Sequence, residues 1–484
     1  HTSVLAILLT VCGIVSGTVS LKGHLKPLGS HTPGKGVTVI GKFSSPHVFY
    51  NEFVGQLQPI WMRNALKTIN HPGVTNWTDA YLREIYGLVP VNVEISKKEN
   101  RKKRSTSLTL EQFLATYKKD DLYVVHSLRN NIEELVLVPP SLACGGFQKV
   151  IQDAVLWMGS GKTQSVLHFD SLDNLLCLFD GQKDLVLIDP KYKEAVEAAG
   201  FVQEGSYSLV DVEKVDMEKF PRFSEIKWKS VRMKAGDCIY IPKGWYHQIT
   251  SSTKRHMAVN LWFSHLYWFN STDCDTITNK GSRSQKMQPI SDFGFASSNE
   301  VLRSKLLDKL HDKGIMIKYN FISSLDSSTE ERREKFFHAV DKYADSALSW
   351  SELYNFDIDK AVLYFPDIFD LPRGSNSLPD DLVLYDPISH PFGAGDDMDK
   401  EVEDDGDDDD DEDDSDDEDG GKDEGMTFKD SLKLQTYKDP ESTIMQTDAE
   451  SEQSDMEDTS KETVKGVSST LNIVRNDKEI KDNS

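Results

Sequence analysis

The sequence lacks any apolar run after its first 20 residues that could cross a bilayer, which takes about 20 consecutive apolar residues. Positive charge is also scarce, since 55 Lys and Arg stand against 79 Asp and Glu in 484 residues, and the formal net charge is −24. A KDEL-like ending is absent as well. We therefore expect no transmembrane anchor, no nucleic-acid partner and no retention signal of the KDEL type.

The first 20 residues have the pattern of a cleaved secretory signal. An apolar stretch from Val4 to Val15 is followed by mostly small residues in Ser16–Ser20, which suits a signal peptide better than a membrane span. No Lys or Arg precedes Lys22, so the basic segment that usually begins a signal peptide is not seen. The alternative is a buried N-terminal strand. We expect a signal peptide over residues 1–20 and a soluble product in the endoplasmic reticulum lumen or outside the cell.

Cysteine is scarce too, with five in the chain, and Cys12 lies within the predicted signal peptide. The other four are an even number, which suits an oxidising compartment and allows three pairings. Cys177 and Cys238 lie in predicted core strands, where they could simply be small apolar side chains. We expect a disulfide between Cys144 and Cys274.

Two N-x-S/T triplets, at Asn76 and Asn270, permit N-glycosylation in the same compartment. The basic run Arg101–Arg104 has three interpretations: a processing site in a secreted chain, a nuclear address, or an exposed loop, which we favour. Cleavage after Arg104 would separate Tyr123 and the chain beyond it from the first hundred residues.

The segment Trp157–Pro190 carries the first two candidate metal ligands. His168 and Asp170 stand two apart in an apolar run, and on a strand such residues project from the same face. The third candidate, His247, ends the segment Gly236–His247, in which alternating apolar residues predict a strand and a Pro-Lys-Gly triplet predicts a turn. Two imidazoles and one carboxylate on one face, with other positions open, form the ligand set of non-haem Fe(II) oxygenases.

Around these ligands the sequence resembles the JmjC-domain 2-oxoglutarate oxygenases, whose fold is a double-stranded β-helix of the cupin type. The resemblance covers roughly Phe43 to His265. Lys183 stands fifteen residues after His168, where the family has the lysine that pairs with the distal carboxylate of 2-oxoglutarate. The resemblance also covers four polar residues: Ser165 beside that carboxylate, Asn174 beside the cosubstrate, Tyr123 as the more loosely matched cosubstrate tyrosine, and Asn260 in the last core strand.

Other polar residues of this region have simpler interpretations. Ser165 and Asn174 could be ordinary polar groups that are satisfied by the backbone. His126, His256 and His265 match no position of the family's motif, so we expect them to be structural.

The expected fold is mainly β: a double-stranded β-helix, or cupin/JmjC jelly roll, with flanking helices, then a small helical segment and a disordered acidic C-terminus. Helical spacing of apolar residues predicts helices over Phe49–Met62 and Leu108–Tyr117, the second beginning at Thr109. The predicted parts are a signal peptide (1–20), an N-terminal α/β region (21–130), the JmjC β-helix core (131–269), a linker (270–295), a helical segment with an EF-hand-like loop (296–390) and a disordered tail (391–484).

Within the helical segment, residues 341–352 resemble the calcium loop of an EF-hand. Positions 1, 5, 9 and 12 of that loop are occupied by Asp341, Asp345, Ser349 and Glu352. Tyr343 replaces the usual oxygen ligand at position 3, and Ser346 replaces the glycine at position 6. We therefore expect weak Ca²⁺ binding or, alternatively, a degenerate helical hairpin. No convincing partner loop is visible in the sequence.

Negative charge is concentrated near the C-terminus. Between Asp396 and Glu424 the chain has 21 acidic residues and two lysines, a net charge of −19, which leaves −5 for the rest. Such a segment cannot bury apolar surface and its charges repel one another, so we predict disorder. Its functional alternatives are solubility alone, low-affinity Ca²⁺ binding, adsorption to basic partners, or contact with a mineral surface.

The resemblance implies an enzyme, an Fe(II)- and 2-oxoglutarate-dependent dioxygenase that hydroxylates a protein substrate in the secretory pathway. His168, Asp170 and His247 would hold the metal. The H-x-D form of the first two ligands, where many histone demethylases of the family have H-x-E, favours hydroxylation over the alternative, demethylation. A second hypothesis is a non-catalytic luminal or extracellular binding protein that uses the EF-like loop and the acidic tail on a cupin scaffold.

Overall fold

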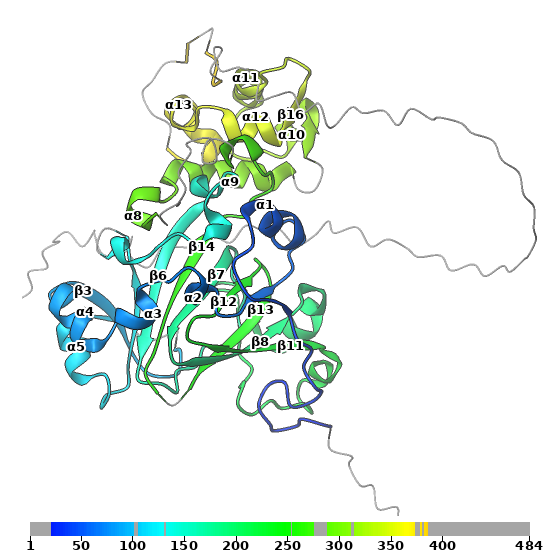
Figure 1. The fold of residues 1–484 in the computed structure, drawn as a ribbon. Coiled ribbons are helices and arrows are strands. Elements are labelled where there is room, and N and C mark those ends of the chain that lie inside the picture. Colours follow the sequence, from blue (N-terminus) through cyan, green and yellow to red (C-terminus); the bar gives the residue numbers. More distant parts are fainter. Residues whose placement is uncertain are drawn as a thin grey trace, which may run out of the picture. The chain divides into compact units, whose positions relative to one another are not determined.

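The structure is a computed structural model that describes residues 21–100, 105–129, 132–252, 254–274, 288–310, 314–372, 378–379 and 382–385 (Figure 1). The predicted signal peptide (1–20), the basic run Arg101–Arg104 and the predicted disordered tail (391–484) lie outside the described residues. Within the described ranges, no helix is both long enough and apolar enough to cross a membrane.

Two β-sheets form the centre of the fold (Figure 1). The smaller sheet has three strands in the order β11 (Trp228–Lys234), β8 (Gln182–Ile188) and β13 (Tyr246–Ser251). The larger sheet has nine strands, in the spatial order β1 (Thr38–Ile40), β2 (Ile60–Met62), β12 (Cys238–Ile241), β7 (Asp173–Asp180), β14 (His256–Phe263), β6 (Ile151–Gly159), β5 (Leu122–Ser127), β3 (Pro90–Ile95) and β4 (Thr106–Thr109).

Apolar side chains of the two sheets meet in one buried cluster. Leu176 and Leu178 of the large sheet pack there with Leu185 and Leu187 of the small sheet. Alternation along the strands explains the cluster, because residues two apart on a strand face the same side. The two sheets with their shared interior confirm the predicted mainly-β jelly roll with flanking helices.

The central strand β7 is buried on both faces. Its even-numbered leucines face the other sheet, while Leu175 and Cys177 belong to a second cluster on the opposite side. Cys177 lies opposite Cys238 of β12, and the two form a disulfide instead of packing as separate apolar side chains. A second disulfide joins Cys144 to Cys274. Cys274 lies in the segment that was expected to be a linker.

The expected helix over Phe49–Met62 is present only in its first part. Helix α1 (Pro46–Phe49) continues as a π-helix, Tyr50–Val54, and the chain then leaves helical geometry with a φ of 49° at Leu57. Residues 60–62 form β2 instead, because pairing with both β1 and β12 satisfies their backbone groups within the sheet. A helical pattern of apolar residues was here overridden by tertiary pairing.

The second expected helix is confirmed as α5 (Leu110–Thr116). Thr109 accepts the backbone N–H of Gln112, and the Gln112 side chain accepts the backbone N–H of Thr109, so the predicted start is a complete capping box. The remaining helices of this part are α2 (Ala65–Thr68), α3 (Gly73–Asn76), α4 (Asp79–Tyr86), α6 (Lys193–Glu197) and the 3₁₀ turns Glu133–Leu135, Pro140–Leu142, Phe147–Lys149, Pro190–Tyr192 and Pro221–Glu225.

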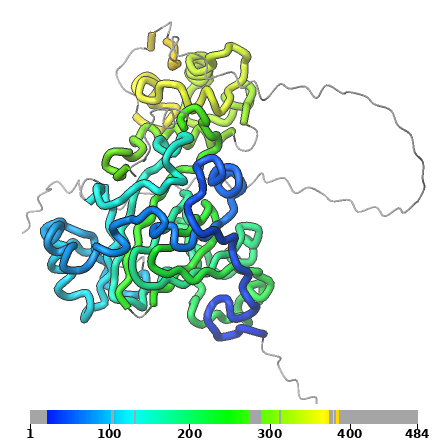
Figure 2. The backbone as a smooth tube through the Cα atoms, viewed as in Figure 1, coloured from blue at the N-terminus to red at the C-terminus, as the bar shows by residue number. Residues whose placement is uncertain are grey.

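Strands of the predicted N-terminal region belong to the large sheet. β5 pairs with β6, and β3 pairs with β5, so the sheet continues across the boundary expected at residue 130. Figure 2 shows the first described residues, in dark blue, beside the green part of the chain near β11, and Lys35 forms a bridge with Lys229 there. Two further short strands, β9 (Phe201–Val202) and β10 (Tyr207–Ser208), form a hairpin.

A group of helices follows the sheets, and we call residues 298–369 the helical module. Phe336 is fully buried in its core, against the rings of Phe321, Phe356 and Phe365. Short helix α8 (Ile290–Phe293) precedes the module. Its elements are α9 (Ser298–Leu310), β15 (Ile315–Ile317), α10 (Lys318–Ser323), α11 (Glu330–Val340), β16 (Ala347–Ser349), α12 (Trp350–Asn355), α13 (Ile358–Tyr364) and the 3₁₀ turn Pro366–Phe369.

The EF-hand-like loop has a structural partner that the sequence did not reveal. β16, inside the loop, pairs antiparallel with β15, and Met316 lies opposite Leu348. Leu348 is position 8 of the loop, so counting back from Met316 places Gly314 at position 6 of a partner segment and Lys309 at position 1. A lysine at the position where Ca²⁺ loops have a carboxylate explains why the sequence pattern is invisible.

Candidate metal and cosubstrate site

Backbone pairing brings His168 and His247 together. The apolar segment that carries His168 is not the regular strand that we expected; it meets β13 at isolated bridges, Gln164 to Thr250 and His168 to His247. The N–H of His247 donates to the carbonyl of His168 at 2.7 Å, and the N–H of His168 donates back at 3.1 Å. The two imidazole centroids consequently lie 4.2 Å apart.

Asp170 completes the cluster. Its Oδ1 lies 3.9 Å from His168 Nε2, and its Oδ2 lies 3.6 Å from His247 Nε2. Two ligands bound to one ion at about 2.1 Å can lie up to about 4.2 Å apart, so both distances fit a shared ion. The three side chains are the group within the described residues that has metal-ligand geometry.

Both imidazoles are held in the orientation that a metal ligand needs. His168 Nδ1 lies 2.9 Å from the carbonyl of Val166, and His247 Nδ1 lies 3.0 Å from the carbonyl of Trp245. A carbonyl can only accept, so Nδ1 carries the proton in each ring. The lone pair of Nε2, on the side of Asp170, is then available to a cation. Burial, assisted by the neighbouring His168, lowers the pKa of His247 to about 4, so this ring is neutral at pH 7 and ready to bind a cation.

The donor set fits Fe(II). Two imidazole nitrogens and one carboxylate on one side of an ion leave the remaining positions for a cosubstrate and O₂, as in the facial triad of non-haem iron enzymes. The backbone N–H of Gly244 donates to the carbonyl of Asp170 at 2.8 Å, which fixes the carboxylate's own backbone. The structure therefore brings the three predicted ligands, His168, Asp170 and His247, together in one site.

Lys183 lies on β8, and 3% of its surface is exposed. Its Nζ donates to the hydroxyl of Ser251 at 3.1 Å, and the two residues are direct cross-strand neighbours. Burial lowers the pKa of Lys183 to about 7, and among the described residues no carboxylate offsets that effect. A buried amine without an anionic partner among the described residues suits an anionic ligand such as the distal carboxylate of 2-oxoglutarate.

Among the described residues, Lys183 bonds the hydroxyl of Ser251, while the predicted cosubstrate residue Ser165 makes a different contact. Ser165 Oγ accepts the backbone N–H of Ile249 at 2.9 Å, so it is satisfied by the backbone. Ser251 instead contacts Lys183, and Thr163 Oγ1 lies 2.8 Å from Ser251 Oγ. Ser251 stands four residues after His247 and so shares its strand face, a signal that could have identified it.

Two asparagines of the large sheet have unsatisfied amide atoms in the described structure. Asn260 accepts the indole N–H of Trp157 at 2.6 Å through Oδ1, while its Nδ2 has no hydrogen-bond partner. Asn174 Oδ1 is buried without a partner as well. Buried polar groups are almost always hydrogen-bonded, so free amide atoms on strands that line the interior fit a polar ligand.

Tyr123 lies on β5 and reaches the same network as Lys183. Its ring packs at 5.6 Å from His256 and its hydroxyl interacts with Thr163. Burial raises the pKa of Tyr123 well above its ordinary value, so the hydroxyl remains a neutral donor. Thr163 in turn bonds His256 Nε2 at 3.1 Å, which places His256, expected to be structural, at the edge of this polar network.

His126 and His265, also expected to be structural, make other contacts. His126 Nδ1 accepts the backbone N–H of Asn92 at 3.4 Å, and burial lowers its pKa. His265 is hydrogen-bonded to the buried Asp173, with 2.7 Å between His265 Nδ1 and Asp173 Oδ2. These contacts are structural ones.

The EF-hand-like loop uses its carboxylates on its own backbone. Asp341 accepts the N–H groups of Asp345 and Ser346 at 3.3 and 3.2 Å. Glu352 accepts the N–H groups of Lys342 and Ser349, both at 2.9 Å. Asp345, Ser349 and Glu352 thus contact the loop itself, and Ser346 takes the left-handed φ of 64° where Ca²⁺ loops have glycine.

Comparison with protein families matches residues 46–268 to a cupin-like domain. This range contains every strand of both sheets except β1, together with all the metal and cosubstrate candidates. The match starts at α1 and ends just after β14. The helical module lies outside it.

Several curated proteins are similar to the same part of the chain. The bifunctional peptidase and (3S)-lysyl hydroxylase JMJD7 of Homo sapiens is 24% identical over 272 residues, which is 48% of this chain and 85% of that protein. Lysine-specific demethylase 8 of Xenopus tropicalis is 26% identical, over 48% of this chain and 53% of that protein. Lysine-specific demethylase JMJ31 of Arabidopsis thaliana is 32% identical over 125 residues, so the chain spans about a quarter of that relative.

Proposed function

We propose that this chain, whose residues 46–268 belong to the cupin-like JmjC family, is an Fe(II)- and 2-oxoglutarate-dependent hydroxylase of protein side chains in the secretory pathway. The observation that carries the proposal is the convergence of His168, Asp170 and His247, together with a buried Lys183 on β8, the strand that pairs with the His247 strand β13.

When bound, Fe(II) supplies the redox chemistry that joins 2-oxoglutarate and O₂ to the hydroxylation of a substrate C–H bond, with succinate and CO₂ as coproducts. The chain holds the reactants for that chemistry. Lys183 provides the positive charge for the distal carboxylate, with the Ser251 hydroxyl beside it. Asn174 and Asn260 offer the unsatisfied amide atoms described above to the bound cosubstrate.

Apolar side chains keep water from the interior. Leu176 and Leu185 belong to the buried apolar cluster between the two sheets, and Ile249, on the strand that carries His247, packs against it. A low local dielectric strengthens the pairing of Lys183 with a carboxylate. It also stabilises the neutral form of His247, which is the form that binds a metal.

Hydroxylation is favoured over demethylation by the first two ligands and by the compartment. The H-x-D spacing of His168 and Asp170 is the form associated above with hydroxylases. Two disulfides, Cys144–Cys274 and Cys177–Cys238, support an oxidising compartment, which holds no histones. The sequon residue Asn76 is exposed at the end of α3, where a glycosyltransferase could reach it.

Purified full-length protein tests the enzymatic part. With Fe(II) it should convert 2-oxoglutarate to succinate, slowly without a substrate and faster with a protein or peptide that it hydroxylates. Product mass separates the two reactions, because hydroxylation adds an oxygen atom whereas demethylation removes a methyl group. Protein that binds Fe(II) and 2-oxoglutarate yet forms no succinate would favour a binding function.

Expression of the precursor in eukaryotic cells tests the location. The proposal requires a product whose electrophoretic mobility changes on glycosidase treatment. Unmodified protein in cytosol or nucleus would contradict the secretory assignment and would favour demethylation instead.

A further inference from the structure

The turn Pro242–Trp245 joins β12 to β13 and delivers His247 to the metal site. Its Gly244 N–H donates to the carbonyl of Asp170 at 2.8 Å, so the same turn contacts two of the three ligand-bearing segments. The carbonyl of Trp245 accepts from His247 Nδ1. The position of this turn therefore sets the positions of both His247 and Asp170.

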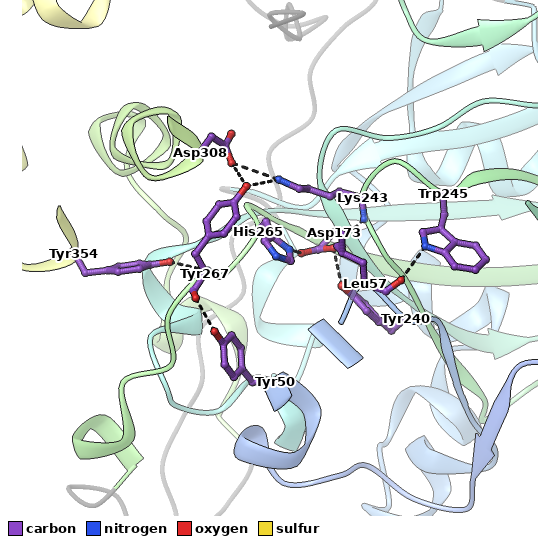
Figure 3. Close-up of polar contacts among 10 residues, drawn as sticks. All are labelled: Tyr50, Leu57, Asp173, Tyr240, Lys243, Trp245, His265, Tyr267, Asp308 and Tyr354. Carbon is purple, nitrogen blue, oxygen red and sulfur yellow. Dashed lines mark hydrogen bonds and ion pairs between the residues drawn. The ribbon is translucent and has the colours of Figure 1, made fainter. Parts of the chain in front are cut away.

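The side chain of Asp173 holds the turn by a hydrogen bond to its backbone (Figure 3). This carboxylate is completely buried, and its Oδ1 accepts the backbone N–H of Lys243 at 2.9 Å and the hydroxyl of Tyr240 at 2.7 Å. His265 bonds the other oxygen, at 2.7 Å. On the far side, Trp245 Nε1 donates to the carbonyl of Leu57 at 2.9 Å.

The side chain of Lys243 leaves the barrel and contacts the helical module. Its Nζ lies 2.6 Å from the hydroxyl of Tyr267 and 3.4 Å from Oδ1 of Asp308, on α9 (Figure 3). The Tyr267 hydroxyl also donates to Asp308. The three side chains form a closed triangle in which a cation, a hydroxyl and an anion satisfy one another.

Tyr267 is itself fixed by elements on both sides. Its carbonyl accepts the hydroxyl of Tyr50 at 2.6 Å, and its backbone N–H donates to the hydroxyl of Tyr354, on α12, at 3.1 Å. Its ring stacks on Trp350 at 5.7 Å and meets His265 edge-on at 4.6 Å. The ring therefore bridges the module and the buried Asp173 cluster.

We propose that Lys243, Tyr267 and Asp308 are positioning residues through which the helical module holds the metal-binding turn. The inference rests on the proposed function, since it needs the metal site to be real. Helix α9, which precedes β15, supplies Asp308 to this contact. Helix α12, which begins within the EF-hand-like loop, supplies Tyr354. The module thus acts on the barrel without needing an ion in its own loops.

Loss of the triangle should loosen the turn without detaching the module. Other contacts remain, since Lys149 Nζ donates to the carbonyl of Tyr354 at 3.4 Å and Trp268 packs on the Tyr354 ring. Asp308→Asn removes the charge that holds Lys243, and Tyr267→Phe removes the shared hydroxyl while keeping the ring. Asp326→Asn, an identical change at an exposed carboxylate of the same module, is the matched control.

The experiment uses the full chain and measures Mn²⁺ affinity by calorimetry, anaerobically and without substrate. We expect Asp308→Asn and Tyr267→Phe each to weaken Mn²⁺ binding by roughly tenfold, the lower end of the range for residues that orient metal ligands. Hydrogen exchange at residues 242–247 should accelerate in both variants. Thermal unfolding and Mn²⁺ affinity of Asp326→Asn should match the wild type.

If the wild type binds Mn²⁺ and both variants have its Mn²⁺ affinity and its hydrogen-exchange rates, the positioning role is overturned. A wild type that binds no Mn²⁺ would instead count against the proposed function itself. A kinetic split provides the second measurement, because a misplaced turn should raise the metal requirement and lower kcat while the 2-oxoglutarate KM, set by Lys183, stays within about twofold. Reversal of this split would also contradict the proposal.

Discussion

The ammonium of Lys183 and the hydroxyl of Ser251 lie 3.1 Å apart on neighbouring strands, opposite each other in register. Cross-strand partners have their Cβ atoms about 5 Å apart, which is why the two side chains can bond each other from adjacent strands. If the proposed function is correct, this pair links cosubstrate binding on β8 to β13, the strand that also carries His247. Several predictions about the site depend on this pair.

Cosubstrate affinity should depend on pH through Lys183. Burial lowers the pKa of the free amine to about 7, whereas a bound carboxylate stabilises the ammonium and raises that pKa. Below pH 7 the proton is already present, so affinity should be flat; above pH 7 binding must take up a proton, and affinity should fall by up to about tenfold per pH unit. Anaerobic calorimetry from pH 6.5 to 8.5, in buffers of different ionisation enthalpy, measures both effects. Constant affinity and no proton uptake would contradict the assignment.

The hydroxyls of this network should differ in importance. Ser251→Ala removes the partner of Lys183, so 2-oxoglutarate affinity should fall by about 0.5 to 1.5 kcal/mol, and Lys183→Ala should cost about 1.5 to 3 kcal/mol. Ser165→Ala is the matched control, because its hydroxyl accepts from the Ile249 backbone. It should affect stability more than cosubstrate affinity. If calorimetric titration shows a larger loss of 2-oxoglutarate affinity in Ser165→Ala than in Ser251→Ala, Ser165 is the cosubstrate hydroxyl.

Removal of a metal ligand should abolish metal-dependent turnover. His168→Ala and Asp170→Ala each delete one of three donors, and we expect Mn²⁺ affinity to fall by more than about 100-fold, beyond the range for residues that only orient ligands. His338→Ala and Asp326→Ala change exposed residues of the module and serve as controls. Succinate formation and calorimetry report the outcome. Full turnover by Asp170→Ala would remove the basis for a facial triad.

The disulfide between Cys144 and Cys274 should stabilise the fold strongly because it closes a segment of 130 residues. Replacing both cysteines by serine should lower the free energy of unfolding by about 3 to 5 kcal/mol while leaving Mn²⁺ binding intact. Denaturant titration of wild type and double variant measures the difference. Detection of free thiols at these positions in protein purified from the secretory pathway would show that the bond is not formed.

The EF-hand-like loop should behave as a structural element. Glu352 accepts backbone N–H groups of the loop, so Glu352→Gln should lower stability by about 1 to 3 kcal/mol in the presence or absence of Ca²⁺. Wild-type Ca²⁺ affinity at this loop should be no tighter than about millimolar. Thermal unfolding in Ca²⁺ and in chelator, with Asp326→Asn as control, tests both statements. A sub-micromolar Ca²⁺ site lost in Glu352→Gln would contradict this interpretation.

The sequence by itself determined the elements whose information is local. The spacing of His168 and Asp170 predicted that they share a site, and the family resemblance added Lys183. The structure brings His168 and Asp170 together, although their segment forms isolated bridges and not a regular strand. The capping box at Thr109 is similarly contained within four residues, and the structure has it as predicted. The charge of the tail and the apolar N-terminus are properties of composition.

Tertiary structure decided whatever depends on pairing between distant segments. Residues 60–62 follow a helical pattern but form β2, because strands on both sides offered hydrogen bonds. The partner of the EF-like loop became visible only when β15 met β16, since its ligand positions carry no oxygen pattern. The contact from Asp308 to Lys243 joins residues 65 apart in the sequence, and no local periodicity records such a contact. The three candidate metal ligands could therefore be predicted from the sequence, whereas their neighbours, such as Ser251 beside Lys183, became visible only when distant segments paired.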